Sequence, residues 1–359
     1  MKSGLKLDWQ LILPSLILIF LSLTVLYSIK VQLALSQFLF MAVSLPFFFI
    51  FASFDYQKHY YLYKIYAVFS FLLLLLPFIF GVVSRGSMRW VQLGNYTLQP
   101  SEIIKPFLII ILASFLIEFK KQKPLIVLIA YSFLLFLPVI LVFKQPDLGS
   151  SLVILFAGLM TLFFSSLPLM CLLLFPLAFL ISLPILKNFL KDYQKQRIFS
   201  FLNPFSDPQG TGYHIIQSLI AIGSGGLWGR GLGRGLQSQL QFLPERQTDF
   251  IFAGIAEELG LWGSAILIFA YFFILLKAFL IAKNSSDDYG RLMAMGIFGL
   301  LFCQGFINLA MNLGLLPITG VTLPLVSAGG SSLLASLIIL GILNNISIHQ
   351  KIRPTVEIK

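Results

Sequence analysis

Charged residues are scarce in this chain of 359 residues: 11% are Asp, Glu, Lys or Arg, whereas 58% are hydrophobic. An average soluble domain has about 25% charged residues, so this composition excludes an ordinary soluble fold. Cysteine is also rare, with Cys171 and Cys303 each alone in an apolar run. Two isolated cysteines give neither a disulfide framework nor metal-ligand spacing, and we interpret them as packing residues.

Acidic residues and histidines are few, numbering 14 and 3, and they form no compact set of metal ligands along the sequence. No cofactor is therefore predicted with certainty, although a divalent cation, Mg²⁺ or Mn²⁺, stays open as a partner of a phosphate-bearing substrate. The net charge of +11 does not indicate nucleic acid, because the basic residues lie in short clusters between apolar runs. Such clusters are typical of loops beside a membrane.

Long apolar runs make up most of what is present, each of about 17 residues or more, the minimum needed to cross the hydrocarbon core. The sequence predicts an all-α polytopic membrane protein, a single domain over residues 1–359 with ten transmembrane helices. One long extracytoplasmic loop, 188–248, separates helices seven and eight. The predicted spans are 9–29, 32–53, 60–81, 101–118, 124–143, 147–165, 167–187, 249–282, 290–313 and 327–348.

Lysine and arginine set the predicted orientation. With the N-terminus inside, the inner segments hold thirteen of these residues and the short outer segments hold five. This bias is typical of cytoplasmic loops, so we expect both termini on the cytoplasmic side. The seven remaining cations lie between Lys187 and Arg246, at or within the outer loop, where the bias does not explain them. An anionic substrate is their expected partner.

Helices four, six, eight and ten are all predicted to begin on the outer face, each with polar residues. Helix N-termini present free N–H groups and a positive dipole end. Taken singly, each motif is explained by a helix cap, an internal ion pair or close packing. Four motifs on one face, beside a basic loop, favour an outer-leaflet site for a phosphate-bearing substrate. The motifs are residues 99–102 with Lys105, residues 145–150, residues 247–249 and residues 327–332.

The long loop has an apolar part and a glycine-rich part. Residues 213–228 are too apolar for free solution and too short to span, so we expect a re-entrant or interfacial segment. Downstream, Arg230 and Arg234 stand among glycines, where guanidinium and backbone groups can both approach an anion. No predicted strand precedes these glycines, so a nucleotide-binding loop is excluded.

Asp249 stands where this polar loop is predicted to become helix eight. An ionisable group at an apolar span usually faces protein or water and marks function, although a simple helix cap is the alternative. Glu257, two turns deeper, is expected to hydrogen-bond in the interior or to line a watery cavity. A stripe of small residues on the face of Asp249 predicts close approach of another helix. The stripe consists of Ala253, Ala256, Gly260 and Gly263.

These motifs, in this order, resemble the SEDS family of shape, elongation, division and sporulation proteins, and its RodA members more than its FtsW members. The resemblance implies a ten-helix peptidoglycan glycosyltransferase of the bacterial inner membrane that polymerises lipid II for cell-wall elongation with a class B penicillin-binding protein. The family's essential acid falls on Asp249, with Trp90, Glu102, Lys105 and Asp147 as supporting positions. The matching stretches are RWVQLGNYTLQPSEIIK, QPDLGSS, LPERQTDFIFAGIAEELGLWG, GLLPITGVTLPLVSAGGSSLL and residues 197–235 of the long loop.

The sequence departs from the family at two positions. Gln247 stands where the family usually has His, which removes a titratable neighbour of Asp249 and leaves Asp249 itself as the expected base. Ala328 stands where the family usually has Tyr, which is expected to loosen the outer mouth of the site.

The predicted chemistry is an inverting transfer in which Asp249 takes the proton from the acceptor's 4-hydroxyl as a lipid diphosphate leaves. Besides membrane lipids, the expected partners are lipid II and the nascent glycan chain; no nucleic acid is expected. The alternatives are a lipid II flippase, an FtsW-type division polymerase and a scaffold for a periplasmic enzyme. The candidate substrate-binding residues are Arg89, Trp90, Glu102, Lys105, Asp147, Arg197, Arg230, Arg234, Arg246, Glu257, Ser327 and Ser331.

The resemblance also implies a partner with a single membrane helix. Small residues on predicted helix nine, Gly296, Gly299 and Ala310, are expected to provide its contact surface beside helix eight.

Overall fold

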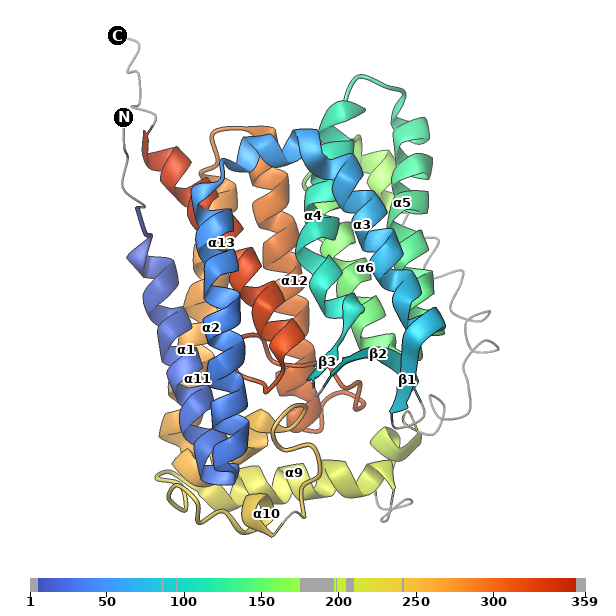
Figure 1. The fold of residues 1–359 in the computed structure, drawn as a ribbon. Coiled ribbons are helices and arrows are strands. Elements are labelled where there is room, and N and C mark those ends of the chain that lie inside the picture. The colour runs from blue at the N-terminus through green and yellow to red at the C-terminus, as the bar shows by residue number, and fades with distance from the viewer. Residues whose placement is uncertain are drawn as a thin grey trace.

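The computed structural model describes residues 6–84, 87–94, 96–174, 197, 199–204, 210–240 and 242–352. Long helices run side by side in a bundle, with the termini at one end (Figure 1). The long helices are α1 (Trp9–Ile29), α2 (Val31–Ser53), α3 (His59–Phe80), α4 (Pro100–Glu118), α5 (Pro124–Lys144), α6 (Leu148–Phe163), α11 (Ile251–Lys283), α12 (Asp288–Asn312) and α13 (Gly330–Ile352). The short ones are the 3₁₀ turn η1 (Tyr56–Lys58), α9 (Thr211–Gly225) and α10 (Leu236–Gln239).

The helices agree with nine of the ten predicted spans, and the chain is a multi-pass membrane protein. In the described part of the chain, eight helices are long and apolar enough to cross a membrane, while α6 has 16 residues. The seventh predicted span, 167–187, lies largely outside the described residues, as does much of the long loop. The count of ten therefore stays a prediction.

Burial separates the central helices from the outer ones. Within an apolar stretch of 18 residues, 89% of the stretch is buried inside the protein in α4 and in α13. The corresponding share is 17% in Tyr56–Phe80, which comprises η1 and α3. Apolar side chains on the outer helices are suited to contact with lipid, whereas charged groups on α4 can face only protein or an internal cavity. The polar residues of α4 are consequently enclosed by the bundle.

A small antiparallel sheet joins α3 to α4, although the sequence predicted only a loop there. Its strands are β1 (Gly81–Ser84), β2 (Ser87–Leu93) and β3 (Tyr96–Leu98), in the order β1-β2-β3. Trp90 pairs with Val82 and Gln92 pairs with Thr97. The sheet lies at the end of the bundle opposite the termini, where α9 and α10 also lie (Figure 1). The central strand therefore carries Arg89 and Trp90 to this end.

The glycine-rich loop after α9 packs against a break in α11. At Gly260 the helix is interrupted, with φ 65° and ψ −157°, a conformation that favours glycine. Carbonyl groups at a helix end need new partners, and the loop supplies them. Arg230 N–H donates to the Glu257 carbonyl at 2.9 Å and Gly231 N–H to the Glu258 carbonyl at 3.0 Å. Leu261 N–H donates in turn to the Gly226 carbonyl at 2.9 Å.

The predicted small-residue stripe is therefore divided by the break, and its first half meets α9 rather than a membrane span. A Cβ atom placed on Gly225, the last residue of α9, would lie 1.9 Å from the Ala256 carbonyl oxygen. Figure 1 shows α9 crossing the end of the bundle, roughly perpendicular to the long helices. This placement favours the interfacial interpretation of residues 213–228 over the re-entrant one.

Candidate functional site

Asp249 lies in the turn before α11, two residues before the first helical residue. Its main-chain carbonyl accepts hydrogen bonds from Asn308 Nδ2 at 3.1 Å and Asn312 Nδ2 at 2.9 Å. The N-cap residue of α11 is Phe250, and the Ala253 N–H in the first turn donates to Asn312 Oδ1 at 3.1 Å. Asp249 is therefore not the N-cap residue of α11, and Asn312 of α12 satisfies one N–H group of its first turn.

The Asp249 carboxylate and the Arg89 guanidinium both lie beside Gly320. A Cβ atom placed on Gly320 would lie 3.5 Å from Asp249 Oδ2 and 3.9 Å from Arg89 Nη1. The same Arg89 Nη1 is 3.6 Å from Asp147 Oδ1. Asp249 is half-buried and the Arg89 side chain is 20% exposed. Arg89 thus places a positive charge between two carboxylates at a position that a molecule from outside can reach.

Asp147 connects three of the predicted motifs. Its Oδ1 accepts from the Ser150 N–H at 3.1 Å, which caps α6, and its Oδ2 accepts from Gln99 Nε2 at 2.9 Å and from Ser101 Oγ at 3.4 Å. The Gln99 main-chain N–H donates to Ser331 Oγ at 2.9 Å. The cap interpretation of Asp147 is correct, and the same carboxylate also orients Arg89.

The fourth motif meets the Asp249 turn directly. Ser327 Oγ donates to the Thr248 carbonyl at 2.6 Å, and the Ala328 N–H donates to the Gln247 carbonyl at 2.8 Å. Gln37 of α2 donates to the Ser327 carbonyl at 3.3 Å and accepts from the Gly329 N–H at 3.2 Å. The two positions at which the sequence departs from the SEDS pattern, Gln247 and Ala328, are therefore hydrogen-bonded neighbours.

Glu102 and Lys105 form a buried ion pair beneath this site. Lys105 Nζ lies 2.5 Å from Glu102 Oε1, and both side chains are at most 5% exposed. Gln304 Nε2 of α12 adds a contact of 3.4 Å to Glu102 Oε2. Charges inside a membrane protein are usually paired in this way. The internal-pair interpretation accounts for these contacts, and a direct role of either residue toward substrate stays a prediction.

Glu257 is directed away from the Asp249 site. It is fully buried, and its oxygens accept from the Gln237 N–H at 2.8 Å, the Ser238 N–H at 2.9 Å and Ser238 Oγ at 2.7 Å. These are the groups at the start of α10, so Glu257 fixes that helix against α11. The expectation of an interior hydrogen-bonding role is consistent with these contacts, and a substrate-binding role of Glu257 stays a prediction.

The remaining predicted cations differ in their surroundings. Arg246 is buried, and burial lowers the pKa of its guanidinium while the nearby Glu258 and Glu257 raise it. Its Nη1 has no hydrogen-bond partner within the described residues. Arg230 and Arg234 are exposed on the glycine-rich loop. Arg197 is half-buried in a stretch whose neighbours lie outside the described residues, so its relation to the site stays a prediction.

Sequence reasoning missed the amides that hold the Asp249 turn. A signal was present: Gln304, Asn308 and Asn312 recur every four residues in an apolar helix, which places them on one face. Gln99 and Gln37 are likewise buried amides with partners far away in the sequence. Such spacing in a membrane helix indicates a polar contact line.

The divalent cation that the sequence left open stays a prediction. Within the described residues, no group of three or more His, Cys, Asp or Glu side chains could hold a metal ion. Between the carboxylates of Asp147 and Asp249, the positive charge is supplied by Arg89.

Comparisons with known sequences agree with this architecture. Residues 7–352 match the sequence model FTSW_RODA_SPOVE, described as cell cycle protein. The chain is 45% identical over 273 residues to peptidoglycan glycosyltransferase MrdB of Escherichia coli (strain K12), covering 76% of this chain and 74% of the relative. It is 39% identical over 303 residues to stage V sporulation protein E of Bacillus subtilis (strain 168), covering 80% and 79% of the two chains.

Two solved structures have the same fold. The crystal structure of Thermus thermophilus rod shape determining protein RodA gives a TM-score of 0.72 at 28% identity, covering 97% of this chain and 99% of that one. The second is a chain from a structure described as the structural coordination of polymerization and crosslinking by a peptidoglycan synthase complex. It gives a TM-score of 0.78 at 32% identity, covering 98% of this chain and 100% of that one. With the match over residues 7–352, these likenesses establish that the chain belongs to the FtsW, RodA and SpoVE family of cell cycle proteins.

Proposed function

We propose that this protein is a peptidoglycan glycosyltransferase that polymerises lipid II into glycan strands for cell-wall elongation. The observation that carries the proposal is that the half-buried Asp249 carboxylate and the Arg89 guanidinium both lie beside Gly320. A base and a cation at one accessible point are what transfer from a lipid diphosphate requires. The names of the relatives, peptidoglycan glycosyltransferase among them, support the same activity.

Asp249 acts as the general base in this mechanism. Its Oδ2 accepts the proton of the acceptor sugar's 4-hydroxyl as that oxygen attacks the anomeric carbon of the donor. The bond from the anomeric carbon to the diphosphate oxygen breaks with inversion, and the electron pair leaves with the diphosphate. A positioned base contributes about 10²–10⁴-fold to such a rate. The asparagines that hold the Asp249 carbonyl keep the carboxylate in place without occupying it.

Arg89 stabilises the negative charge that develops on the diphosphate. Asp147 holds one face of its guanidinium at 3.6 Å, while Nη1 also lies beside Gly320. Fixed charges in a site of low dielectric stabilise a transition state without reorganisation. Trp90, half-buried on the same strand, is suited to pack against a sugar face.

The flippase alternative is less well supported. A transporter of this kind places its polar site near the middle of the membrane. Here the contacts among Asp249, Asp147 and Ser331 gather at the starts of α6, α11 and α13, in the half of the bundle that lies away from the termini (Figure 1). A site at one membrane surface suits polymerisation on that side.

The end that carries this site faces the periplasm of the bacterial inner membrane, and both termini are cytoplasmic. Figure 1 places the α4–α5 turn, which holds Lys120, Lys121 and Lys123, at the same end as the termini. The sheet, α9 and α10 occupy the opposite end. Cytoplasmic loops are enriched in Lys and Arg, which supports this orientation.

The partner is a class B penicillin-binding protein, an assignment supported by the likeness to a chain from a peptidoglycan synthase complex. The expected contact at Gly296 and Gly299 is wrong, because both glycines pack inside the bundle. A Cβ atom on Gly296 would lie 2.4 Å from Thr161 Oγ1, and one on Gly299 would lie 2.6 Å from Met160 Cγ.

The exposed aromatic side of α12 is the better contact for the partner's membrane helix. Phe302 and Phe306 are 40% and 56% exposed, and their rings are stacked with centroids 5.9 Å apart. A cysteine that replaces Phe306 should crosslink to the partner's membrane helix, whereas one that replaces Leu72 on α3 should not. Capture from α3 alone would reject this placement.

Polymerisation by purified components tests the function. The chain, purified with its partner, should convert lipid II into glycan strands, and the Asp249→Asn variant prepared in parallel should not. If the purified protein moved lipid II across vesicle membranes but never polymerised it, the flippase hypothesis would replace the glycosyltransferase hypothesis.

A further inference from the structure

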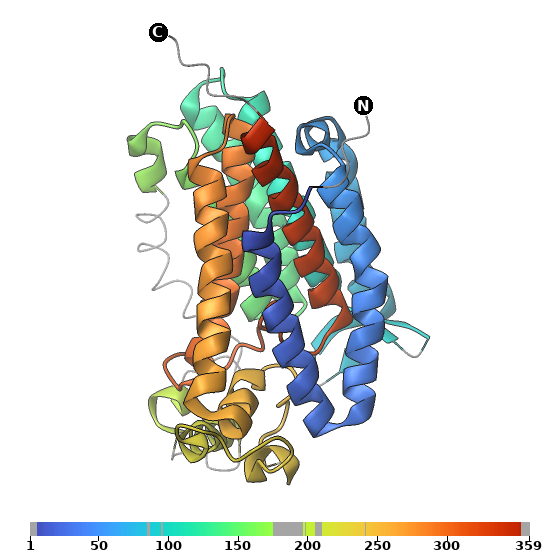
Figure 2. The same cartoon turned by 90° about the vertical axis from the view of Figure 1, so that its left-hand side faces the viewer.

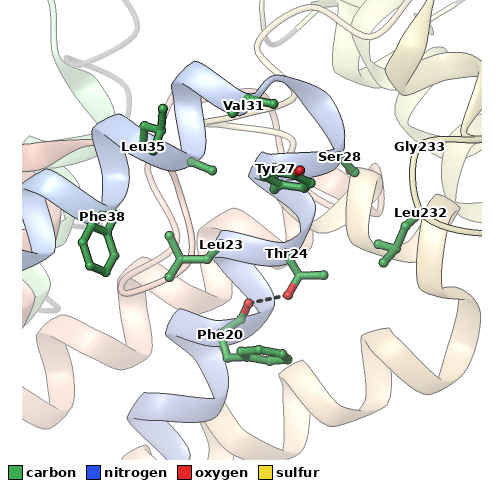
Figure 3. A pocket seen from close by; sticks show the side chains of 11 residues that line it. Phe20, Leu23, Thr24, Tyr27, Ser28, Val31, Leu35, Phe38, Leu232 and Gly233 are labelled. Atoms are coloured by element: carbon green, nitrogen blue, oxygen red, sulfur yellow. Dashed lines mark hydrogen bonds between the residues drawn. The ribbon is translucent and has the colours of Figure 1, made fainter.

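An apolar groove of about 640 Å³ lies between the α1–α2 hairpin and the glycine-rich loop (Figure 3). Its volume falls within the range of about 300–1,000 Å³ typical of small-molecule sites. Leu232 and Gly233 of the loop lie along one side of it. The helices provide the other lining side chains, which are Phe20, Leu23, Thr24, Tyr27, Ser28, Val31, Ala34, Leu35 and Phe38.

The open side of this groove faces lipid rather than water. Both helices are membrane spans, and Phe20 and Leu35 are 70% and 58% exposed on their outer surface. Figures 1 and 2 both place the α1–α2 turn at the same end of the bundle as α9 and α10. A hydrocarbon chain can therefore enter the groove from the bilayer without crossing a polar surface.

The loop beside the groove carries unpaired positive charge at headgroup level. Arg230 and Arg234 flank Leu232, both are exposed, and neither is ion-paired with a described residue. Trp228 is 79% exposed and its ring lies 6.2 Å from that of Trp262. Tryptophan is enriched at the membrane–water interface. The two guanidinium groups are thus placed where a lipid phosphate would lie.

Two sets of interactions connect the groove to the chain around the Asp249 turn. Ser28, which lines the groove, donates to Glu258 Oε2 at 2.5 Å, and Glu258 is an electrostatic neighbour of Arg246. On the other helix, Ala34 and Phe38 line the groove while Gln37 binds the chain at Ser327 and Gly329. The groove therefore adjoins the elements that build the proposed active site.

We propose that this groove binds the polyprenyl chain of the lipid diphosphate substrate, with the diphosphate held by Arg230 and Arg234. The assignment rests on the proposed function, in which the acceptor lipid II also carries a lipid diphosphate, and it leaves Arg89 to the diphosphate of the donor. Two unpaired guanidinium groups complement the charge of a diphosphate better than the single phosphodiester of a common phospholipid. Contact with the hydrocarbon chain contributes binding energy away from the reacting carbon.

Binding of geranylgeranyl diphosphate to the complex of the full chain and its partner, in phosphatidylcholine nanodiscs, tests the groove. Leu35→Trp fills the groove and should weaken binding about tenfold by displacing apolar contact. Leu39→Trp is the matched control: Leu39 is on the same helix, one turn further on, is 53% exposed and does not line the groove. It should bind the probe as the wild type does.

The double change Arg230→Gln and Arg234→Gln tests the headgroup contact. It should also weaken binding of geranylgeranyl diphosphate about tenfold, because two charge-assisted contacts are lost. Binding of neutral geranylgeraniol should stay unchanged.

The assignment is overturned if Leu35→Trp binds the diphosphate as tightly as the wild type does. It is also overturned if phosphatidylglycerol competes as well as the diphosphate, since the groove would then hold ordinary phospholipid. Lipid II polymerisation is measured on the same samples. A wild-type complex that does not polymerise lipid II rejects the proposed function, whereas normal polymerisation with unaltered binding in Leu35→Trp rejects the groove alone.

Discussion

Two carboxylates in one short segment, Asp249 and Glu257, have opposite surroundings. Glu257 is fully buried, and the main-chain N–H groups of Gln237 and Ser238 occupy its oxygens. Asp249 is half-buried, and its main-chain carbonyl rather than its carboxylate is held by α12. Its Oδ2 instead lies beside Gly320.

The contrast separates a structural role in this segment from the proposed chemical role. A carboxylate whose lone pairs are taken by backbone donors is a structural anchor, because removing it leaves buried N–H groups without partners. A half-buried carboxylate whose backbone is anchored and whose side chain can be reached by a substrate can take part in proton transfer. Substitutions at the two positions should therefore affect different quantities: the rate at Asp249 and the stability at Glu257.

The largest effect is expected for Asp249→Asn. The amide keeps the size and the hydrogen-bonding capacity of the side chain but loses the basic oxygen, so lipid II polymerisation should fall by at least about 10²-fold. Binding of lipid II and of the partner should change much less. Quantifying glycan product per folded complex measures this. Near wild-type polymerisation by a folded variant would remove Asp249 from the chemistry.

A smaller loss is expected for Arg89→Gln, which removes the cation between Asp147 and Asp249. We expect kcat/KM for lipid II to fall by about tenfold through the lost charge-assisted contact to the diphosphate. The matched control is Arg291→Gln, which breaks the 2.9 Å ion pair with Asp288 at the start of α12. An equal loss in both variants would mean that Arg89 acts only through folding.

Glu257→Gln should lower the stability of the protein rather than its rate, the opposite of what is expected for Asp249→Asn. An amide nitrogen facing the start of α10 cannot accept both N–H groups, so the free energy of unfolding should fall by about 1–3 kcal/mol. The rate per folded molecule should be retained. Thermal unfolding in detergent and turnover by the folded fraction give the two values. The comparison is Glu118→Gln, whose exposed pair with Lys64 is worth about 0–1 kcal/mol.

The smallest effect on activity is expected from single cysteines that test whether both carboxylates lie near the periplasmic surface. Native Cys171 and Cys303 are first replaced by Ala. A cysteine at exposed Leu240, between α10 and the Asp249 turn, should react with an impermeant maleimide when only the outer membrane is permeabilised. A cysteine at Gln122 should not. Labelling at Gln122 alone would invert the proposed topology.

The membrane helices could be predicted because hydrophobic length is a local property. The predicted 60–81 is observed as His59–Phe80, and 124–143 as Pro124–Lys144. The sheet was missed because its strands have three to seven residues and lie between long apolar helices. The break at Gly260 was missed because glycine in an apolar run also suits a packed helix, and the positive φ depends on the loop docked against it.

Most contacts around the candidate site could not be predicted, because the interacting residues lie far apart in the sequence. Asp249 was singled out from its place between a polar loop and an apolar run. The hydrogen bonds of Glu257 could not be predicted, because its partners are in α10, a four-residue helix with no strong sequence signal of its own. The amides of Asn308 and Asn312 could have been found from their spacing, but their acceptor, a main-chain carbonyl, leaves no trace in the sequence.

The interruption at Gly260 also determines how the Asp249 turn responds to the bilayer. An unbroken helix of 33 residues would be about 50 Å long, whereas the hydrocarbon core is about 30 Å thick. Residues 261–283, after the break, extend for about 35 Å and match that thickness. A change in the tilt of residues 261–283 in a thinner or thicker membrane therefore does not require the same movement of residues 251–259, before the break. Asp249 lies before the break and is held through its main-chain carbonyl by Asn308 and Asn312, so its depth depends on α12 rather than on the tilt of residues 261–283.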